Sequence, residues 1–155
     1  MKLKNQLKVK GEVEIICRNA KTGKVKWIEK TNNMVVTLGK NAIADSLRGN
    51  ETGNRGIITY CALGGDDTAP ALTDTALGDE IGRKQISVRS SAGNVATFQT
   101  FFTTSEVVGT LKEAGLFGDT ATGTADSGIL YARTAIDRTK SANDTLSLTW
   151  NIVIG

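Results

Sequence analysis

Five acidic residues gather in the segment ALGGDDTAPALTDTALGDE, residues 62–80, beside the only proline of the chain. They are Asp66, Asp67, Asp74, Asp79 and Glu80. A calcium loop of the helix–loop–helix type needs oxygen ligands at alternate positions and a glutamate at its end, and this segment lacks that spacing. Asp66 and Asp67 are adjacent, so their side chains are expected to diverge. We therefore predict a structural connection without a metal site, in which Asp74 is the N-cap of a short turn; a loose surface cation site is the alternative.

The residues of common catalytic arrangements are missing or poorly placed. The chain has no histidine, which is the commonest general base. Lys112 and Glu113 are neighbours, but adjacent residues of a strand face opposite sides. A glycosidase needs two facing acids in a groove that is usually lined with aromatic residues, and these make up only 5% of the chain. We predict a non-enzymatic protein with no catalytic residue, cofactor or metal; an enzyme that uses the acidic loop is a competing hypothesis.

The two cysteines, Cys17 and Cys61, lie far apart in apolar runs and show no zinc-ligand spacing. We predict buried thiols, with a disulfide between two strands as the alternative. The tryptophans Trp27 and Trp150 are expected in the core. Tyr60 and Tyr131 are the candidates for a sugar-binding surface, although both have core-like neighbours.

The net charge of +3 hides an asymmetry between the two parts of the chain. Residues 1–50 hold 11 Lys/Arg and 4 Asp/Glu (net +7), and residues 51–155 hold 8 and 12 (net −4). The basic residues alternate with apolar ones, which favours a solvated strand face or edge protection over nucleic-acid binding. Docking onto an acidic protein surface is the alternative that we favour after the solvated face and before nucleic-acid binding. Its contact residues are Lys2, Lys4, Lys8 and Lys10.

Alternation of polar and apolar residues dominates the chain and predicts a mainly β protein, an antiparallel β-sandwich or jelly-roll-like barrel. Residues 1–31 are expected to hold a hairpin that turns at NAKTGK, and one helix is predicted at about residues 39–48, with Gly49 ending it and Lys40 facing solvent at its start. IITYCALGG (57–65) is predicted to be a strand buried on both faces. The remaining strands are expected in RKQISVRSS, NVATFQTFFTTSE, GTLKEAGLFG, ILYARTAI and TLSLTWNIVI. About eight strands form one domain, 1–155, without a segment that could span a membrane and without an export signal.

Several motifs, in their order along the chain, resemble those of a recurrent type of tailed-bacteriophage virion structural protein. An ALG strand leads into TAPALTDTAL; RKQI, EAGLF and ARTAI follow; and the chain ends on LSLTWNIVI. These motifs occupy residues 62–64, 68–77, 83–86, 113–117, 132–136 and 146–154. The resemblance covers roughly residues 32–155. Residues 1–31 match less distinctly and are interpreted as an anchoring arm.

The resemblance implies a virion component that is assembled in the host cytoplasm. We expect a surface module of the tail, in a fibre or baseplate, that associates with copies of itself as a trimer or ring and docks on other virion proteins. A head-decoration protein that stabilises the capsid is the alternative within this family. A carbohydrate-binding β-sandwich is the alternative from another class. Neither a membrane nor nucleic acid is expected as a partner.

Overall fold

The structure, a computed structural model, describes residues 7–49 and 56–155. This part of the chain contains nine strands and one helix. Their bounds are β1 Val9–Asn19, β2 Val25–Val35, α1 Thr37–Leu47, β3 Ile58–Gly64, β4 Glu80–Gln85, β5 Val88–Ala92, β6 Val95–Phe102, β7 Gly109–Gly118, β8 Ile129–Lys140 and β9 Asp144–Ile154. The predicted mainly β class with a single helix is confirmed.

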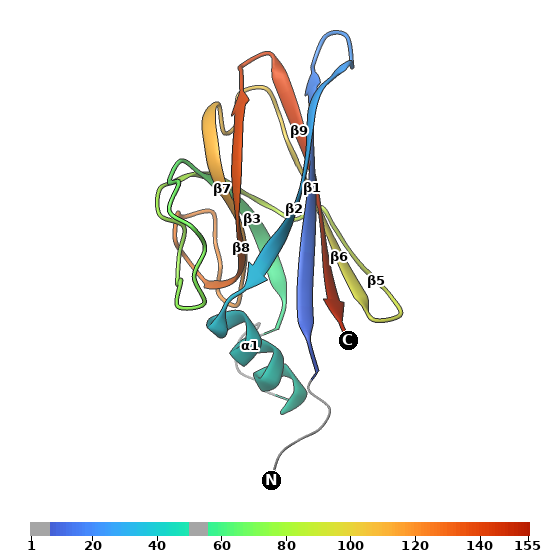
Figure 1. The fold of residues 1–155 in the computed structure, drawn as a ribbon, viewed down its shortest axis with the longest axis vertical. Coiled ribbons are helices and arrows are strands. Elements are labelled where there is room, and N and C mark those ends of the chain that lie inside the picture. The colour runs from blue at the N-terminus through green and yellow to red at the C-terminus, as the bar shows by residue number, and fades with distance from the viewer. Residues whose placement is uncertain (1–6, 50–55) are drawn as a thin grey trace.

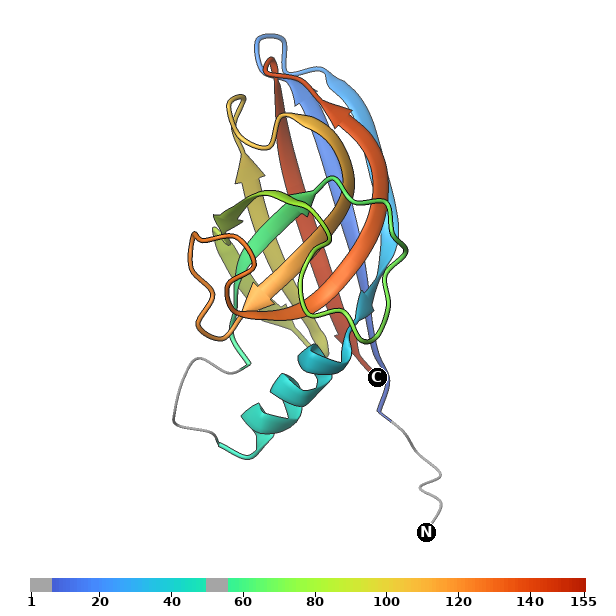
Figure 2. The same ribbon diagram turned by 90° about the vertical axis from the view of Figure 1, so that its left-hand side faces the viewer.

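The strands form one curled antiparallel sheet in the order β4-β3-β7-β8-β2-β1-β9-β6-β5. Because the sheet curls, β3, β7 and β8 form one layer that faces β1, β9 and β6 across the core (Figures 1 and 2). Strand β2 pairs with β1 over most of its length. It pairs with β8 only through Met34 and Val35, at its end. This short junction joins the layers into a sandwich-like fold.

The core fills the space between the layers with the inward-facing residues of the alternating strands. In β9, Leu146 and Trp150 are fully buried, as the alternation predicts. Cys17 and Cys61 are free and fully buried, so the prediction of buried thiols is confirmed. Burial raises the pKa of both thiols, that of Cys61 to about 12. Trp27 is only half-buried, and its indole N–H donates to the carbonyl of Thr139.

The segment RKQISVRSS, predicted to be one strand, is divided between two. The N–H of Ile86 donates to the Thr59 carbonyl of β3 at 2.8 Å, whereas the N–H of Ser87 donates to the Gln99 carbonyl of β6 at 2.9 Å. Consecutive residues therefore belong to opposite layers, and the chain crosses between them here. Ile86 is buried at the crossing. The break between β4 and β5 explains why nine strands are present where about eight were expected.

Helix α1 lies at the same end of the sandwich as the C-terminus (Figure 2). It begins at Thr37, slightly before the predicted start, and Gly49 follows its end with φ +71°, as expected for a glycine at this position. The Gly49 N–H donates to the Ser46 carbonyl at 3.1 Å. Gly39 packs directly on the Tyr131 carbonyl of β8, where a Cβ atom would clash. Glycine therefore allows the helix to approach the sheet closely.

Candidate functional site

The acidic loop between β3 and β4 is organised around a carboxylate from another strand. Glu113 of β7 is 1% exposed. It accepts hydrogen bonds from the backbone N–H groups of Gly78 at 3.0 Å and Asp79 at 2.9 Å. The Nε of Arg133 donates to the same carboxylate at 2.9 Å. The end of the loop is thus fixed to the sheet by a buried, charge-assisted network.

Arg133, on β8, connects this network to the beginning of the loop. Its guanidinium donates to the Asp74 carboxylate at 2.8 Å and to the Thr68 carbonyl at 3.0 Å. Although burial alone would raise the pKa of Asp74, hydrogen bonds from the Ala71 N–H and from Arg133 outweigh it and lower that pKa below its ordinary value. The side chain of Arg133 is only 4% exposed, and the carboxylates of Asp74 and Glu113 compensate its buried charge.

The loop differs from the prediction at Asp74. Asp74 is not an N-cap, because it bonds back to the Ala71 N–H, three residues earlier, and no helix follows. Leu77 packs into the fold against Gly115, where a Cβ atom would lie 2.9 Å from the Leu77 Cδ2 atom, whereas Leu72 is 47% exposed. Gly115 therefore makes room for the loop without interrupting β7.

A second buried arginine fixes the neighbouring loop, residues 119–128. Arg83 and Glu80 form an ion pair of 2.6 Å whose side chains are 2% and 1% exposed. The guanidinium lies over the ring of Phe117, 4.4 Å from its centroid, and donates to the Ser127 carbonyl at 2.9 Å. Both long loops on this side of the molecule are therefore held by buried arginine–glutamate pairs.

These bonds account for most of the acidic residues that the sequence singled out. Asp66 accepts from the N–H and the hydroxyl of Thr68 and lies 3.5 Å from Arg133. Asp67 is exposed. Over residues 7–49 and 56–155, the structure contains no group of three or more His, Cys, Asp or Glu side chains arranged to hold a metal ion. Lys112 and Glu113 face opposite sides, as predicted, and Lys112 pairs with Asp137.

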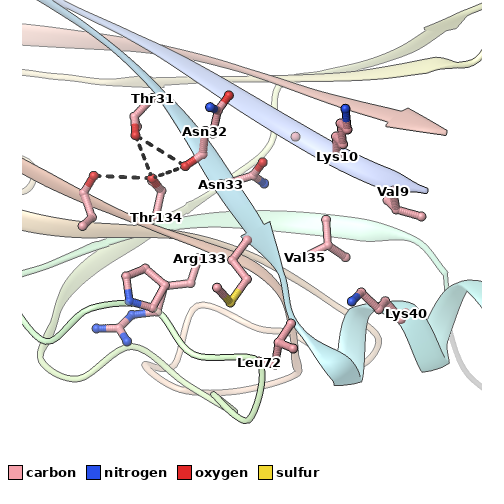
Figure 3. A pocket seen from close by; sticks show the side chains of 14 residues that line it. Val9, Lys10, Thr31, Asn32, Asn33, Val35, Lys40, Leu72, Arg133 and Thr134 are labelled. Carbon is pink, nitrogen blue, oxygen red and sulfur yellow. Dashed lines mark hydrogen bonds between the residues drawn. The ribbon is translucent and has the colours of Figure 1, made fainter. Parts of the chain in front are cut away.

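A groove opens where β2 leaves β8. Upstream of the junction at Met34 and Val35, the two strands separate and enclose a groove of about 760 Å³ (Figure 3). The Thr134 hydroxyl bridges part of the gap by donating to the Asn32 carbonyl at 3.0 Å. The acidic loop forms one wall through Pro70 and Leu72. The groove is therefore bounded by both layers and by the loop that Arg133 holds.

Asn33 lines this groove with an unpaired side-chain amide. The residue is 9% exposed, and neither its Oδ1 nor its Nδ2 has a hydrogen-bond partner among the described residues. Gly11 is its register partner on β1, and any side chain there would collide with the Asn33 amide. The pairing of a glycine with an asparagine thus leaves room for a polar group on the inward face of the sheet.

Two exposed lysines flank the groove, Lys10 on β1 and Lys40 on α1 (Figure 3). Neither side-chain ammonium group forms an ion pair or hydrogen bond within the part of the chain that the structure describes. Of the predicted contact residues, Lys2 and Lys4 lie outside the described residues. Lys8 and Lys10 are exposed. Sequence reasoning gave Lys40 no role and did not identify Asn33.

The tyrosines predicted as candidates for sugar binding are not displayed on the surface. Tyr131 is 4% exposed, and burial raises its pKa to about 12. Tyr60 is half-buried, with Arg83 over its ring at 5.9 Å. Neither ring is free to stack on a ligand, and no aromatic residue lines the groove beside Asn33.

The sequence matches no protein-family model, and no curated protein is significantly similar to it. Among the described residues, no helix has the length and hydropathy required to cross a membrane.

Proposed function

We propose that this chain is a non-enzymatic structural module of a tailed-phage virion, a component of the tail that associates with copies of itself. The motif order described above motivates the assignment to a virion. The buried networks at Glu113 and Arg83 support a structural role, because in them the carboxylates of the loop form hydrogen bonds and ion pairs that fix its conformation. A head-decoration protein is the alternative, and the location of the chain on the particle distinguishes the two.

The observation that carries self-association is the edge strand β5. It lies at one end of the sheet order, and all five of its residues are exposed. An unpaired strand edge is a template for pairing with another chain. Val88 is 44% exposed and Phe101 of the adjacent β6 is 47% exposed. Since Val88 is in register with Gln99, two residues from Phe101, both side chains lie on the outer face beside this edge.

Light scattering after size-exclusion chromatography tests this proposal. The wild-type chain is expected to elute as a trimer or larger ring, and the double variant Val88→Lys/Phe101→Lys as a monomer. Ile28→Lys is the matched control, because Ile28 is an equally exposed apolar residue (46%) on β2. A wild-type monomer at the highest soluble concentration, with no binding to particles that lack the protein, would refute self-association and docking together.

The carbohydrate-binding alternative is tested separately on a glycan array. Its prediction is binding that Tyr131→Ala abolishes. The burial of Tyr131 argues against this outcome, because a ring that is 4% exposed offers no face to a sugar.

A further inference from the structure

The unpaired amide of Asn33 needs a physical explanation. A buried donor or acceptor without a partner destabilises a protein by about 1–3 kcal/mol. Asn33 has two such atoms, whereas Thr59, Thr100, Tyr131, Asp144 and Trp150 have one each among the described residues. Valine in place of Asn33 would continue the apolar inward face formed by Val13 and Val35. The chain instead has an asparagine, opposite the glycine that makes room for it. The carboxamide carries two N–H donors and a carbonyl acceptor, and both its polar atoms lie buried and unpaired at the floor of the groove.

The backbone of β2 adds to this pairing capacity. Over residues 25–33 it pairs with β1 on one side, and no described strand pairs with it on the side of β8. Backbone groups at an unpaired edge bind the main chain of an extended peptide, as does a carboxamide side chain. The volume of about 760 Å³ falls within the range of ligand sites, about 300–1,000 Å³.

The surroundings of the amide define the side chains that the groove would accept. Lys10 and Lys40 place two uncompensated positive charges beside it. Val9, Val35 and Leu72 contribute aliphatic surface. The lining contains no aromatic ring on which a sugar could stack. This combination suits a chain of alternating acidic and aliphatic residues better than a carbohydrate.

We propose that this groove binds an extended acidic peptide segment of a partner protein. The Asn33 amide pairs with a peptide group of the segment, and Lys10 and Lys40 pair with its carboxylates. The site is separate from the β5 edge, so this proposal does not depend on self-association. A chain that binds the peptide as a monomer would refute the first proposal alone, and an oligomer that does not bind it would refute the second alone.

The test is a titration of the ¹⁵N-labelled full chain followed by NMR. The probe is the blocked peptide acetyl-Ala-Asp-Val-Asp-Ala-amide, and its partner is the same peptide with Asn in place of Asp. The acidic peptide is expected to give saturable shifts of the Asn33 side-chain amide signals and of the backbone signals of residues 31–33. The Asn peptide is expected to give markedly smaller shifts at the same concentration.

Matched variants separate a specific site from general charge attraction. Lys10→Ser/Lys40→Ser is expected to weaken binding about tenfold, since each exposed pair contributes up to about one kcal/mol and 1.4 kcal/mol corresponds to a factor of ten. Lys21→Ser/Lys24→Ser removes the same charge from the exposed turn between β1 and β2 and is expected to leave binding unchanged. Asn33→Val keeps both groove lysines and is expected to weaken binding.

Four results would overturn the proposal. The first is the absence of shifts at Asn33, and the second is equal weakening by the two lysine pairs, which would show attraction to net charge alone. The third is an equal response to succinate at the same carboxylate concentration, which would identify a site for a small dicarboxylate. The fourth is a response to sialyllactose in place of the peptide, which would identify a carbohydrate site.

Discussion

The substitution Glu113→Gln removes one charge from the centre of the network that holds the acidic loop. Glutamine has nearly the same shape, but it has one acceptor oxygen where the carboxylate has two. The Oε1 atom of Glu113 accepts from the Asp79 N–H, and its Oε2 atom accepts from the Gly78 N–H and from Arg133. One set of donors therefore loses its acceptor, and the buried guanidinium of Arg133 keeps only part of its compensating charge.

Breaking a buried ion pair from one side lowers the free energy of unfolding by about 3–5 kcal/mol. For a chain of 155 residues, each kcal/mol corresponds to about 2–4 °C, so Tm is expected to fall by about 6–20 °C. Urea unfolding followed by the fluorescence of the buried Trp150 measures the loss directly. The variant is expected to remain folded at 25 °C unless the wild-type stability lies at the lower end of the usual range, about 5–15 kcal/mol.

Glu29→Gln is the matched control for this experiment. Glu29 pairs with Arg138 at 2.6 Å, but the two side chains are 25% and 39% exposed. Pairs of this kind contribute about 1 kcal/mol or less, so the control is expected to lose much less stability than Glu113→Gln. If both substitutions gave the same small loss, the view that Glu113 holds the loop through a desolvated ion pair would be refuted.

Three further predictions follow from other parts of the molecule. The pKa of Asp74 is lowered in the folded state, so its contribution to stability is present above the ordinary aspartate pKa of about 3.9 and is lost as the pH falls through the folded value. Asp74→Asn should therefore make Tm fall less steeply in this acidic range, and an unchanged slope of Tm against pH would contradict this. Asn33→Val should raise the free energy of unfolding by about 1–2 kcal/mol in urea, because it removes an unpaired buried amide; a loss would mean that the amide is satisfied. Cys17 and Cys61 should both resist a thiol reagent at pH 8 until the protein is denatured, since burial raises the pKa of each; rapid labelling of the folded chain would show that a thiol is accessible.

The strands were predictable where one face is apolar and the other polar. In β9 the alternation from Leu146 to Trp150 determines which side faces the core, and the structure agrees. The crossing at Ile86 gives no such signal, because the pattern continues through it while the hydrogen-bond partners change from one layer to the other. The local alternation of polar and apolar residues predicts whether a side chain faces the core or the solvent, but it does not predict the layer to which the strand belongs.

The candidate site was less predictable because its parts are distant in sequence. Alternation places Lys112 and Glu113 on opposite sides, but it does not indicate that Glu113 faces inward beneath a loop more than thirty residues earlier. Asn33 lies in a stretch of β2 with polar residues at successive positions, so no apolar face is visible there. Its inward direction becomes apparent only from the burial of Val35 on the same face and from the space above Gly11.

The two kinds of buried polar group in this chain are connected through Arg133. Its guanidinium is fully engaged with Asp74, Thr68 and Glu113, and the residue also lines the groove beside the unpaired Asn33. Pro70 and Leu72, which form the groove wall, lie between the two loop positions that this arginine holds. A satisfied network thus keeps the wall in place, beside an amide that is buried and unpaired. Loosening the network by Glu113→Gln should therefore weaken peptide binding although Glu113 does not line the groove, and the same substitution should leave the β5 edge unaffected because that strand lies at the far end of the sheet order.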